Sequence, residues 1–504
     1  MRKLFPLLLA GGLLLAAGPL PTALAADTHA DAGSQKAAGK DFDLPAFPDD
    51  AHVSQTTHVN GKTLHYTATV GWLPVRDAKG KLTGQVMYTA YTVPGKHRPV
   101  TFAFNGGPGA SSVYLNLGAI GPKAVKFGDE GDAPSDPATL KDNPGTWLDF
   151  TDLVFIDPIG TGFSRALVDE KEATKLFYST DADIHYLSRI VYDWLIHNGR
   201  MESRKYLVGE SYGGFRGPRI TEYLQTQLGV AMNGVVLLSP YLDPGAYADR
   251  YVSPVPWMLT LPPIAAAHLE REGKLTDQAM QKVIDYTRTT YASTLMKGHS
   301  DPAAYTAMIH KVTELTGLDP QFVKRSGGRI STGAYLREAH RDQGKLGSVY
   351  DSNVTTWDPF PYAPHQMSGD PILNTIIAPT TEAMVHFITQ TVGWKYYGRY
   401  HALSYDVNKQ WHEDKDAREG SVQQLRKAVA NDSHLHVLIA HGWNDLSCPF
   451  MVSELAVDQM PAMGGGDRVQ VNKYPGGHMF YTRQDSQSAL REDVMRMYQA
   501  TGGR

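Results

Sequence analysis

The amino-acid sequence predicts an α/β protein with a mostly parallel central sheet and helices on both faces. Short apolar, β-branched runs, typical of buried strands, alternate along the chain with helical patterns, and this alternation favours a parallel sheet covered by helices. From about residue 246 to 400 the strand-like runs disappear, and helical stretches alternate with loops rich in Gly and Pro. The candidate core strands are Val100–Phe104, Asp152–Asp157, Tyr206–Val208, Gly234–Leu238, His436–Ala440 and Arg468–Lys473.

The N-terminal residues have the pattern of an export signal. Two basic residues precede an apolar segment, residues 7–24, which is broken by Gly and Pro and ends near the small-x-small site Ala23–Ala25. We therefore expect a secretory signal peptide over residues 1–25, cut at that point or after Ala26, with an uncleaved anchor as the alternative. Residues 26–50, rich in Ala, Asp, Gly and Lys, predict a mobile leader.

An antiparallel meander is predicted at the start of the core. Leu64–Val70 and Gln85–Tyr91 have the composition of strands, and Asn60-Gly61 is a hairpin turn pair. Asp77–Gly80 is a second turn signal. Strands joined by such short turns are expected to pair antiparallel.

Two helices and the insertion complete the predicted organisation. Apolar residues recur at helical spacing over residues 181–199, where Thr180 or Asp181 can cap the start. A closing helix is expected over residues 487–499. The core is thus predicted in two parts, residues 51–245 and 401–504, which are separated by a helical cap insertion over residues 246–400.

Charge and cysteine content narrow the classes of function. The 504 residues carry a formal net charge of −4 without a long basic run, so nothing predicts nucleic-acid binding. The single cysteine, Cys448, excludes an internal disulfide, which a domain of this size does not need. Beyond the signal segment no stretch is long and apolar enough to span a bilayer, so no membrane association is expected after signal removal.

The segment Gly209-Glu-Ser-Tyr-Gly213 matches the Gly-x-Ser-x-Gly pattern of a serine nucleophile. It follows the apolar run Tyr206–Val208 and precedes the amphipathic stretch Ile220–Leu228, which is the strand, turn and helix context that the pattern requires. Its glycines permit a sharp bend in which a Cβ would clash. We expect Ser211 to be a catalytic nucleophile; the alternative is a serine that caps an ordinary helix.

A serine hydroxyl needs a base within hydrogen-bond reach, and the base needs an acidic group to orient it. In hydrolases that carry this pattern on an α/β sheet, the three groups follow the chain order Ser, Asp, His. Asp445 follows the candidate strand His436–Ala440, and His478 follows the last candidate strand behind two glycines. Taken alone, Asp445 could be a turn residue or a helix cap, and His478 could be a loop histidine. Together with Ser211, in the required order, they predict a catalytic triad.

An oxyanion hole requires two backbone N–H groups directed at the developing negative charge. The residue after the nucleophile, Tyr212, is expected to supply one of them. The second is expected from the loop Asn105-Gly-Gly-Pro-Gly109, which follows a core strand and whose glycines allow substrate to approach the backbone. An ordinary Pro-Gly turn is the alternative.

Four motifs follow one another along the chain: Asn105–Ser112, Val154–Ser164, Gly209–Gly214 and Gly476–Met479. In this order they resemble the motifs of the serine carboxypeptidases, particularly their bacterial branch. The resemblance covers about residues 57–500, apart from the insertion. It implies an α/β-hydrolase fold with a helical cap, and the release of single residues from a peptide's C-terminus through an acyl-enzyme on Ser211.

The resemblance also implies roles for individual residues. Gly107 and Tyr212 would supply the oxyanion N–H groups. Asn105, Gly106 and Glu210 would bind the terminal carboxylate of the substrate. Glu210 would do so in its protonated form, so the family tends to prefer acidic pH.

The chain departs from the family pattern near these motifs. Ala110 stands where many members have a cysteine, and Ala103 where they have a tryptophan. Ala119 stands where the second carboxyl of a glutamate pair is expected, which implies a thinner carboxylate-binding network. Cys448 lies three residues after Asp445, where some members carry a free cysteine near the leaving-group site; an ordinary buried thiol is the alternative.

The resulting hypothesis is a serine carboxypeptidase that is exported to the periplasm or secreted and acts on peptide or protein substrates without a metal or other cofactor. His434 and His436 lack a third ligand at a usual spacing. The alternatives are an esterase, an acyltransferase or a proline-type aminopeptidase on the same triad. Glu210 before the serine, and Tyr212 rather than tryptophan after it, favour the carboxypeptidase. A non-catalytic binding protein would not need the complete triad.

Overall fold

The computed structural model describes residues 45–126, 134–247, 251–363, 366–412, 420–463 and 466–502. The expected signal peptide, residues 1–25, and the leader up to residue 44 lie outside these residues. None of the described helices combines the length and the hydropathy needed to cross a membrane.

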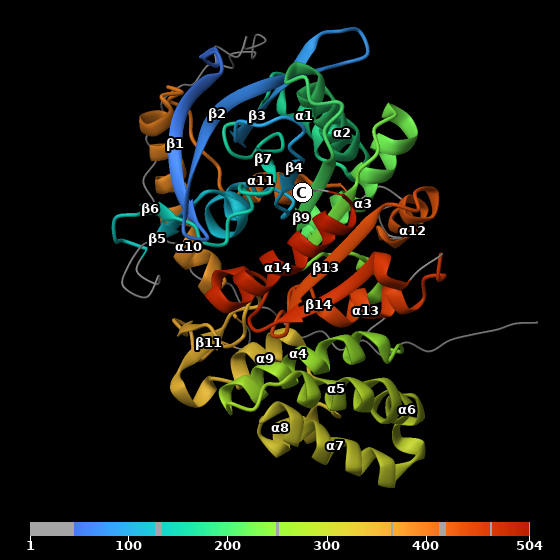
Figure 1. Cartoon of the computed structure of the whole chain (residues 1–504). Coiled ribbons are helices and arrows are strands. Elements are labelled where there is room, and N and C mark those ends of the chain that lie inside the picture. The colour runs from blue at the N-terminus through green and yellow to red at the C-terminus, as the bar shows by residue number, and fades with distance from the viewer. Residues whose placement is uncertain are drawn as a thin grey trace, which may run out of the picture. The chain divides into compact units, whose positions relative to one another are not determined.

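A ten-stranded sheet runs through the described residues, in the order β1-β2-β3-β7-β4-β9-β10-β13-β14, with β8 paired to β3 (Figure 1). From β7 to β14 neighbouring strands are parallel. β1, β2 and β3 form an antiparallel meander, which confirms the predicted sheet and its N-terminal extension. The strands of this sheet are β1 (Ala51–Val59), β2 (Lys62–Arg76), β3 (Leu82–Thr92), β4 (Val100–Phe104), β7 (Asp152–Ile156), β8 (Arg165–Ala166), β9 (Lys205–Glu210), β10 (Gly234–Leu238), β13 (His436–Gly442) and β14 (Val469–Tyr474).

Helices cover both faces of the sheet. Successive strand residues point to opposite sides, and apolar side chains on each side are buried under helices. Leu207 and Val235 belong to one buried cluster with apolar residues of α2, α3 and α12. Val208 and Val236 belong to another cluster, with residues of α10 and α14. The helices outside the insertion are α1 (Glu170–Phe177), α2 (Thr180–His197), α3 (Tyr212–Tyr223), α11 (Tyr405–Gln410), α12 (Val422–Asn431), α13 (Phe450–Asp458) and α14 (Gln484–Ala500).

The insertion is mainly helical, and its two parts pack in different places. Helices α4 to α9 lie together beside the β13–β14 end of the sheet (Figure 1), and their apolar residues form clusters with Leu446 and with Phe450 of α13. By contrast, Phe387 and Ile388, which follow α10, pack on the main sheet. The helices of the insertion are α4 (Val255–Arg271), α5 (Asp277–Tyr286), α6 (Ala292–Lys297), α7 (Pro302–Thr316), α8 (Pro320–Arg325), α9 (Thr332–Glu338) and α10 (Pro371–His386).

The expectation that the insertion lacks strands is wrong. β11 (Lys345–Gly347) and β12 (Thr355–Trp357) form a small antiparallel pair. Three residues are too few to give a recognisable alternation of apolar and polar side chains. A second small pair, β5 (Lys123–Lys126) and β6 (Thr139–Asp142), lies outside the insertion.

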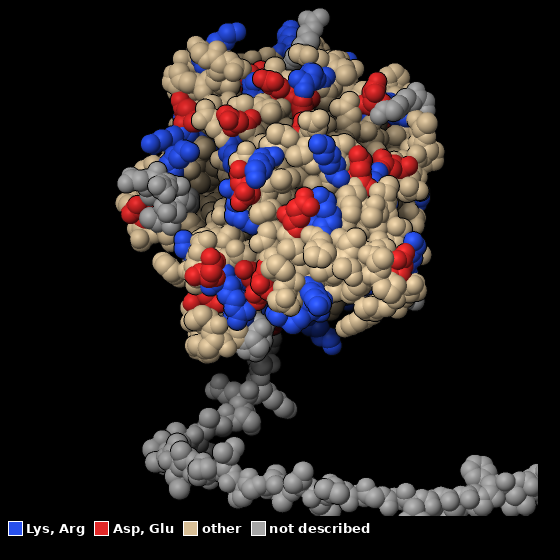
Figure 2. Space-filling view, turned by 90° about the horizontal axis from the view of Figure 1, so that it is seen from below, with Lys and Arg blue, Asp and Glu red and all other residues tan. Residues whose placement is uncertain are grey.

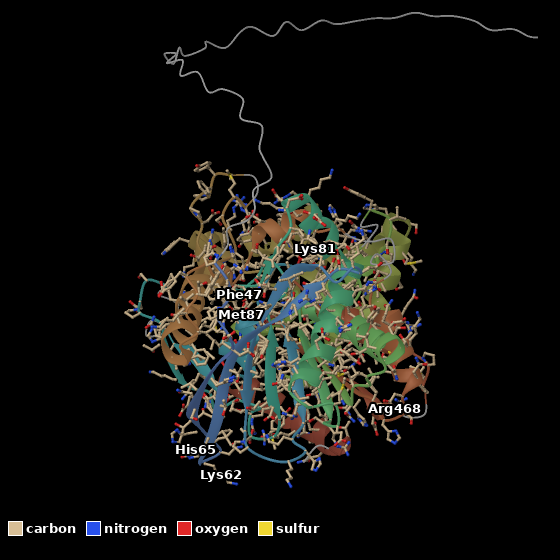
Figure 3. The ribbon with its side chains drawn as sticks, turned by 90° about the horizontal axis from the view of Figure 1, so that it is seen from above. Phe47, Lys62, His65, Lys81, Met87 and Arg468 are labelled. Atoms are coloured by element: carbon tan, nitrogen blue, oxygen red, sulfur yellow. The ribbon has the colours of Figure 1, made fainter. Side chains whose placement is uncertain are left out.

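The predicted leader ends earlier than residue 50. Phe47 is buried against Trp72 and Trp394, and Asp50 accepts a hydrogen bond of 2.6 Å from Tyr88. Figure 3 shows Phe47 over the sheet near Met87, which belongs to the same buried cluster. The folded unit therefore includes residues that composition assigned to the leader.

Charged side chains of both signs are interspersed on the face shown in Figure 2. Among the described residues on that face, no large area of a single sign is seen. This pattern is typical of a solvated protein surface.

Candidate active site

Ser211 lies in a strained turn between β9 and α3. Its backbone has φ 58° and ψ −121°, a conformation that residues other than glycine rarely adopt. The turn is held by hydrogen bonds from the Ser211 N–H to the Leu238 carbonyl (3.0 Å) and from the Gly214 N–H to the Ser211 carbonyl (2.8 Å). A serine at such a strand-to-helix turn presents its hydroxyl above the sheet.

The two glycines of the motif are required by close backbone contacts. A Cβ on Gly209 would lie 2.1 Å from the Gly213 carbonyl oxygen, and a Cβ on Gly213 would lie 2.2 Å from the carbonyl oxygen of Phe104. Real Cβ atoms do not approach backbone oxygens so closely. The bend at Ser211 therefore depends on glycine at both positions.

His478 and Asp445 are brought together from loops that follow β14 and β13. The His478 Nδ1 lies 2.8 Å from Asp445 Oδ2, and both side chains are buried. Asp445 also accepts the backbone N–H groups of Ser447 (2.8 Å) and Cys448 (2.9 Å). Burial lowers the pKa of His478, but Asp445 and Cys448 together raise it more, so the pKa lies well above its ordinary value. This stabilises the imidazolium that a base must become when it takes a proton.

The loop that carries His478 is fixed on two sides. Its N–H donates to the Tyr350 carbonyl, and its carbonyl accepts a hydrogen bond of 2.8 Å from the Ser239 hydroxyl. The rings of Tyr350 and His478 are 5.1 Å apart, edge to face. Neither Tyr350 nor Ser239 was recognised from the sequence, because their contacts depend on the tertiary fold.

A further set of hydrogen bonds joins the insertion to the loops that carry Asp445 and His478. Glu270 of α4 accepts a hydrogen bond of 2.5 Å from the Nδ2 of Asn444, the residue that precedes Asp445. Glu270 also accepts both Nη atoms of Arg483, which in turn reaches Asp351 at 2.6 Å. Burial raises the pKa of Glu270, but Arg483, Asn353 and Asn444 together outweigh it, so this pKa is lowered.

The loop after β4 lies against the nucleophile turn. A Cβ on Gly106 would lie 2.4 Å from the backbone nitrogen of Tyr212, so glycine allows this approach. Gly107 adopts φ +101°, which again favours glycine. Gly106, Gly107 and Tyr212 all line one cavity with Ser211. The structure thus brings the two predicted sources of oxyanion N–H groups to the same place.

Glu210 is buried beside Ser211 and has a polar partner for each oxygen. Asn105 Nδ2 donates to Oε2, and the Tyr481 hydroxyl donates to Oε1 at 2.7 Å. Burial raises the pKa of Glu210, although His478, Tyr481 and Asn105 oppose the increase. Asn105 was expected at this site, whereas Tyr481 was missed, since nothing in its local sequence marks it.

The predicted site residues surround a cavity of about 360 Å³. Asn105, Glu210, Ser211 and His478 line it, while Asp445 lies behind His478. The remaining walls are mainly apolar or aromatic and come from both the core and the insertion. They include Tyr114, Tyr241, Tyr350, Leu373, Ile376, Leu403, Trp411 and Met479.

Cys448 also lines this cavity. Its thiol is buried and interacts with His478. Burial raises the pKa of the Cys448 thiol. The neutral thiol is therefore favoured, and Cys448 forms part of the wall next to His478.

Comparison with known proteins identifies a family and a fold. A model of the family described as serine carboxypeptidase matches residues 59–488. "Serine carboxypeptidase-like 50" of Arabidopsis thaliana is 32% identical over 184 residues, which cover 36% of this chain and 36% of the relative. "Pheromone-processing carboxypeptidase KEX1" of Tuber melanosporum is 28% identical over 191 residues, 37% of this chain and 27% of the relative.

These matches span only about a third of the length of the curated relatives. A much longer alignment is obtained with the crystal structure of Kex1(delta)p, a prohormone-processing carboxypeptidase from Saccharomyces cerevisiae. It covers 86% of this chain and 91% of that chain, with a TM-score of 0.53 and 15% sequence identity. At that identity the likeness concerns the fold, which is that of the α/β-hydrolases.

Proposed function

Because this chain belongs to the serine carboxypeptidase family, we propose that it is an exported enzyme that releases C-terminal residues from peptides. Ser211 is the nucleophile, His478 the general base and Asp445 the group that orients it. The observation that supports this proposal is that Ser211 and His478 share one cavity with the buried pair Asn105 and Glu210. An acyl-transfer centre next to groups suited to a carboxylate is what removal of a terminal residue requires.

In the proposed reaction, His478 Nε2 takes the proton of the Ser211 hydroxyl as its oxygen attacks the scissile carbonyl. The N–H groups of Gly107 and Tyr212 stabilise the resulting oxyanion. His478 then gives the proton to the leaving amine, and the terminal residue departs. Water, activated by the same imidazole, hydrolyses the acyl-enzyme and restores Ser211.

The substrate's terminal carboxylate is proposed to bind at Asn105, Gly106 and Glu210. A carboxylate is an acceptor only, so Glu210 must be protonated to donate to it. The burial that raises the pKa of Glu210 supports such a role. Glu210 directly precedes Ser211, so its carboxyl lies close to the scissile carbonyl of the substrate. This short separation limits how many substrate residues can follow the scissile bond.

Matched substrates with a free or an amidated C-terminus test the proposal. An N-blocked dipeptide acid should be hydrolysed at least tenfold more efficiently, by kcat/KM, than its amide, because hydrogen bonds to a charged group are worth about 1.5–3 kcal/mol. Digestion of a longer peptide, followed by mass spectrometry, should show loss of single residues from the C-terminus. Equal efficiency on acid and amide would instead favour an esterase or another acyl hydrolase on the same triad.

The pattern of residues 1–25 supports export of the enzyme through a secretory signal. N-terminal sequencing of the protein from a cell that exports it should find a start after Ala25 or Ala26. A retained Met1 in the exported protein would contradict cleavage.

A further inference from the structure

We propose that Tyr481 is a positioning residue for Glu210 and limits the pH range over which the enzyme recognises a terminal carboxylate. The inference rests on the proposed function, since it concerns the same carboxylate-binding residues. It adds a residue from the loop behind His478, which neither the motifs nor the expected site contained.

The contacts of Tyr481 are specific. The residue is in the short helical turn Phe480–Thr482, its side chain is buried, and its hydroxyl donates to Glu210 Oε1 at 2.7 Å. Its ring lies next to Gly118, where a Cβ would be 3.6 Å from Cε2. The neighbouring Ala119, at the position expected to hold a second carboxyl, is buried and has no polar side-chain group. Glu210 thus has a hydroxyl partner, Tyr481, in a chain that carries Ala119 at the position expected for a second acid.

A phenol differs from a carboxyl as a partner because it does not titrate in the working range of the enzyme. Burial and the nearby Glu210 raise the pKa of Tyr481 well above 10, so it remains a donor. A donor favours the charged form of its acceptor, so Tyr481 lowers the pKa of Glu210. Asn105 and His478 act in the same direction, while burial and Asp445 raise this pKa.

The charge of Glu210 determines how well a substrate carboxylate binds. A substrate carboxylate requires protonated Glu210, whereas Tyr481 favours ionised Glu210. Recognition of the terminal carboxylate should therefore weaken as pH rises through the pKa of Glu210, and Tyr481 places that point at a lower pH than burial alone would. Removing the hydroxyl should extend recognition to higher pH.

The test is the pH profile of KM for Tyr481→Phe, measured with an N-blocked dipeptide acid and its amide. The pH at which KM for the acid begins to rise should shift upward by about one unit. A hydrogen bond to a charged group contributes about 1.5 kcal/mol or more, and one pKa unit corresponds to about 1.4 kcal/mol. KM for the amide should keep the wild-type profile. Tyr498→Phe is the matched control, because it removes a buried hydroxyl that bonds Thr101 at 2.6 Å and not Glu210.

The possible failures are distinguishable. If wild type distinguishes acid from amide but the profile of Tyr481→Phe is unshifted or moves downward, the role of Tyr481 is overturned and the proposed function stands. If wild type treats acid and amide alike at every pH, the carboxylate site itself is wrong, and this inference falls with it. Should Tyr481→Phe not fold, Tyr481→Met removes the donor while filling similar space, and the same shift is expected.

Discussion

Asp445 is a buried acceptor that determines which ring nitrogen of His478, the proposed general base, carries the proton. Its carboxylate faces His478 Nδ1 at 2.8 Å and is held by two backbone N–H groups. An acceptor on Nδ1 requires the proton there, which leaves Nε2 free to take a proton from Ser211. An asparagine in this place could present its amide nitrogen to the ring and favour the other tautomer.

We therefore expect Asp445→Asn to reduce kcat by about 10³- to 10⁴-fold while leaving the fold intact. Steady-state kinetics on an N-blocked dipeptide, with circular dichroism as the check on folding, measures this. Asp432→Asn is a suitable control, because the Asp432 carboxylate accepts a local hydrogen bond from the backbone N–H of His434 in a surface loop. A loss of less than tenfold for Asp445→Asn would show that this carboxylate does not orient the base.

At the level of single residues, the sequence was informative where chemistry restricts both residue type and spacing. Ser211 and His478 could be recognised because glycines must accompany them in narrow turns. The helix cap was less certain: Ser179, and not Thr180 or Asp181, accepts the N–H of Ala182. Neighbouring polar residues compete for such a role, and the geometry that decides among them depends on how the chain enters the helix.

The turn after β7 supports the loop that follows β4 through a buried carboxyl. Asp157 accepts the Ser112 N–H at 2.8 Å and the Tyr400 hydroxyl at 3.3 Å. Burial raises its pKa to about 7. A carboxyl whose pKa is higher in the folded state than in the unfolded chain stabilises the fold below the unfolded pKa, and this contribution is lost as pH rises toward the folded pKa.

Wild type should consequently lose stability relative to Asp157→Asn between about pH 4 and pH 7, by as much as about 4 kcal/mol. Chemical denaturation of both proteins across this range measures the difference in the free energy of unfolding. The difference should flatten at still lower pH, where both states carry the proton. Parallel stability curves for the two proteins would contradict a raised pKa at Asp157.

Helix α4 connects the cap to two loops of the candidate active site through Glu270. Its carboxylate accepts hydrogen bonds from Asn444 and Arg483, whose loops carry Asp445 and His478 respectively. Glu270→Ala should lower kcat by about tenfold or more and change KM less, because small displacements of catalytic groups are costly. Glu272→Ala provides the control, since Glu272 is an exposed residue that pairs with Lys274. Equal kcat for the two variants would show that the cap does not position the triad.

The two halves of the insertion show the limit of sequence reasoning about elements. Helical spacing identified the region, but it does not say which surface an apolar face covers. Residues near α10 pack on the main sheet with Phe155 and Tyr91, while α4 to α9 form separate clusters that include Leu446 and Phe450. Burial partners depend on contacts between distant segments, which no local pattern encodes.

The cavity combines walls from most of the chain. Leu373 and Ile376 come from α10, Leu403 and Trp411 from the segment after it, and Tyr114 from the loop after β4. These walls are mainly apolar, and placing a charged side chain against them would cost its hydration. The shape of the proposed substrate cavity thus depends on how the insertion packs onto the core, and this packing could not be predicted from the sequence.

We expect N-blocked dipeptides with Phe or Leu at the residues flanking the scissile bond to be cleaved at least tenfold more efficiently than those with Asp or Glu. A series that varies one position at a time, compared by kcat/KM, measures the preference on each side of the bond. Leu373→Asp should reduce the preference for apolar residues. A wild-type enzyme that favours acidic side chains would contradict the assignment of this cavity as the substrate site.

In the whole molecule, three distant loops are proposed to form one acylation centre at Ser211. Labelling with a serine-reactive fluorophosphonate, followed by mass spectrometry of proteolytic fragments, tests it most directly. We predict one adduct per chain, on the fragment that contains Ser211, with formation at least 10³-fold slower in His478→Ala. An adduct on another serine, or labelling of Ser211 at the same rate without His478, would contradict the account.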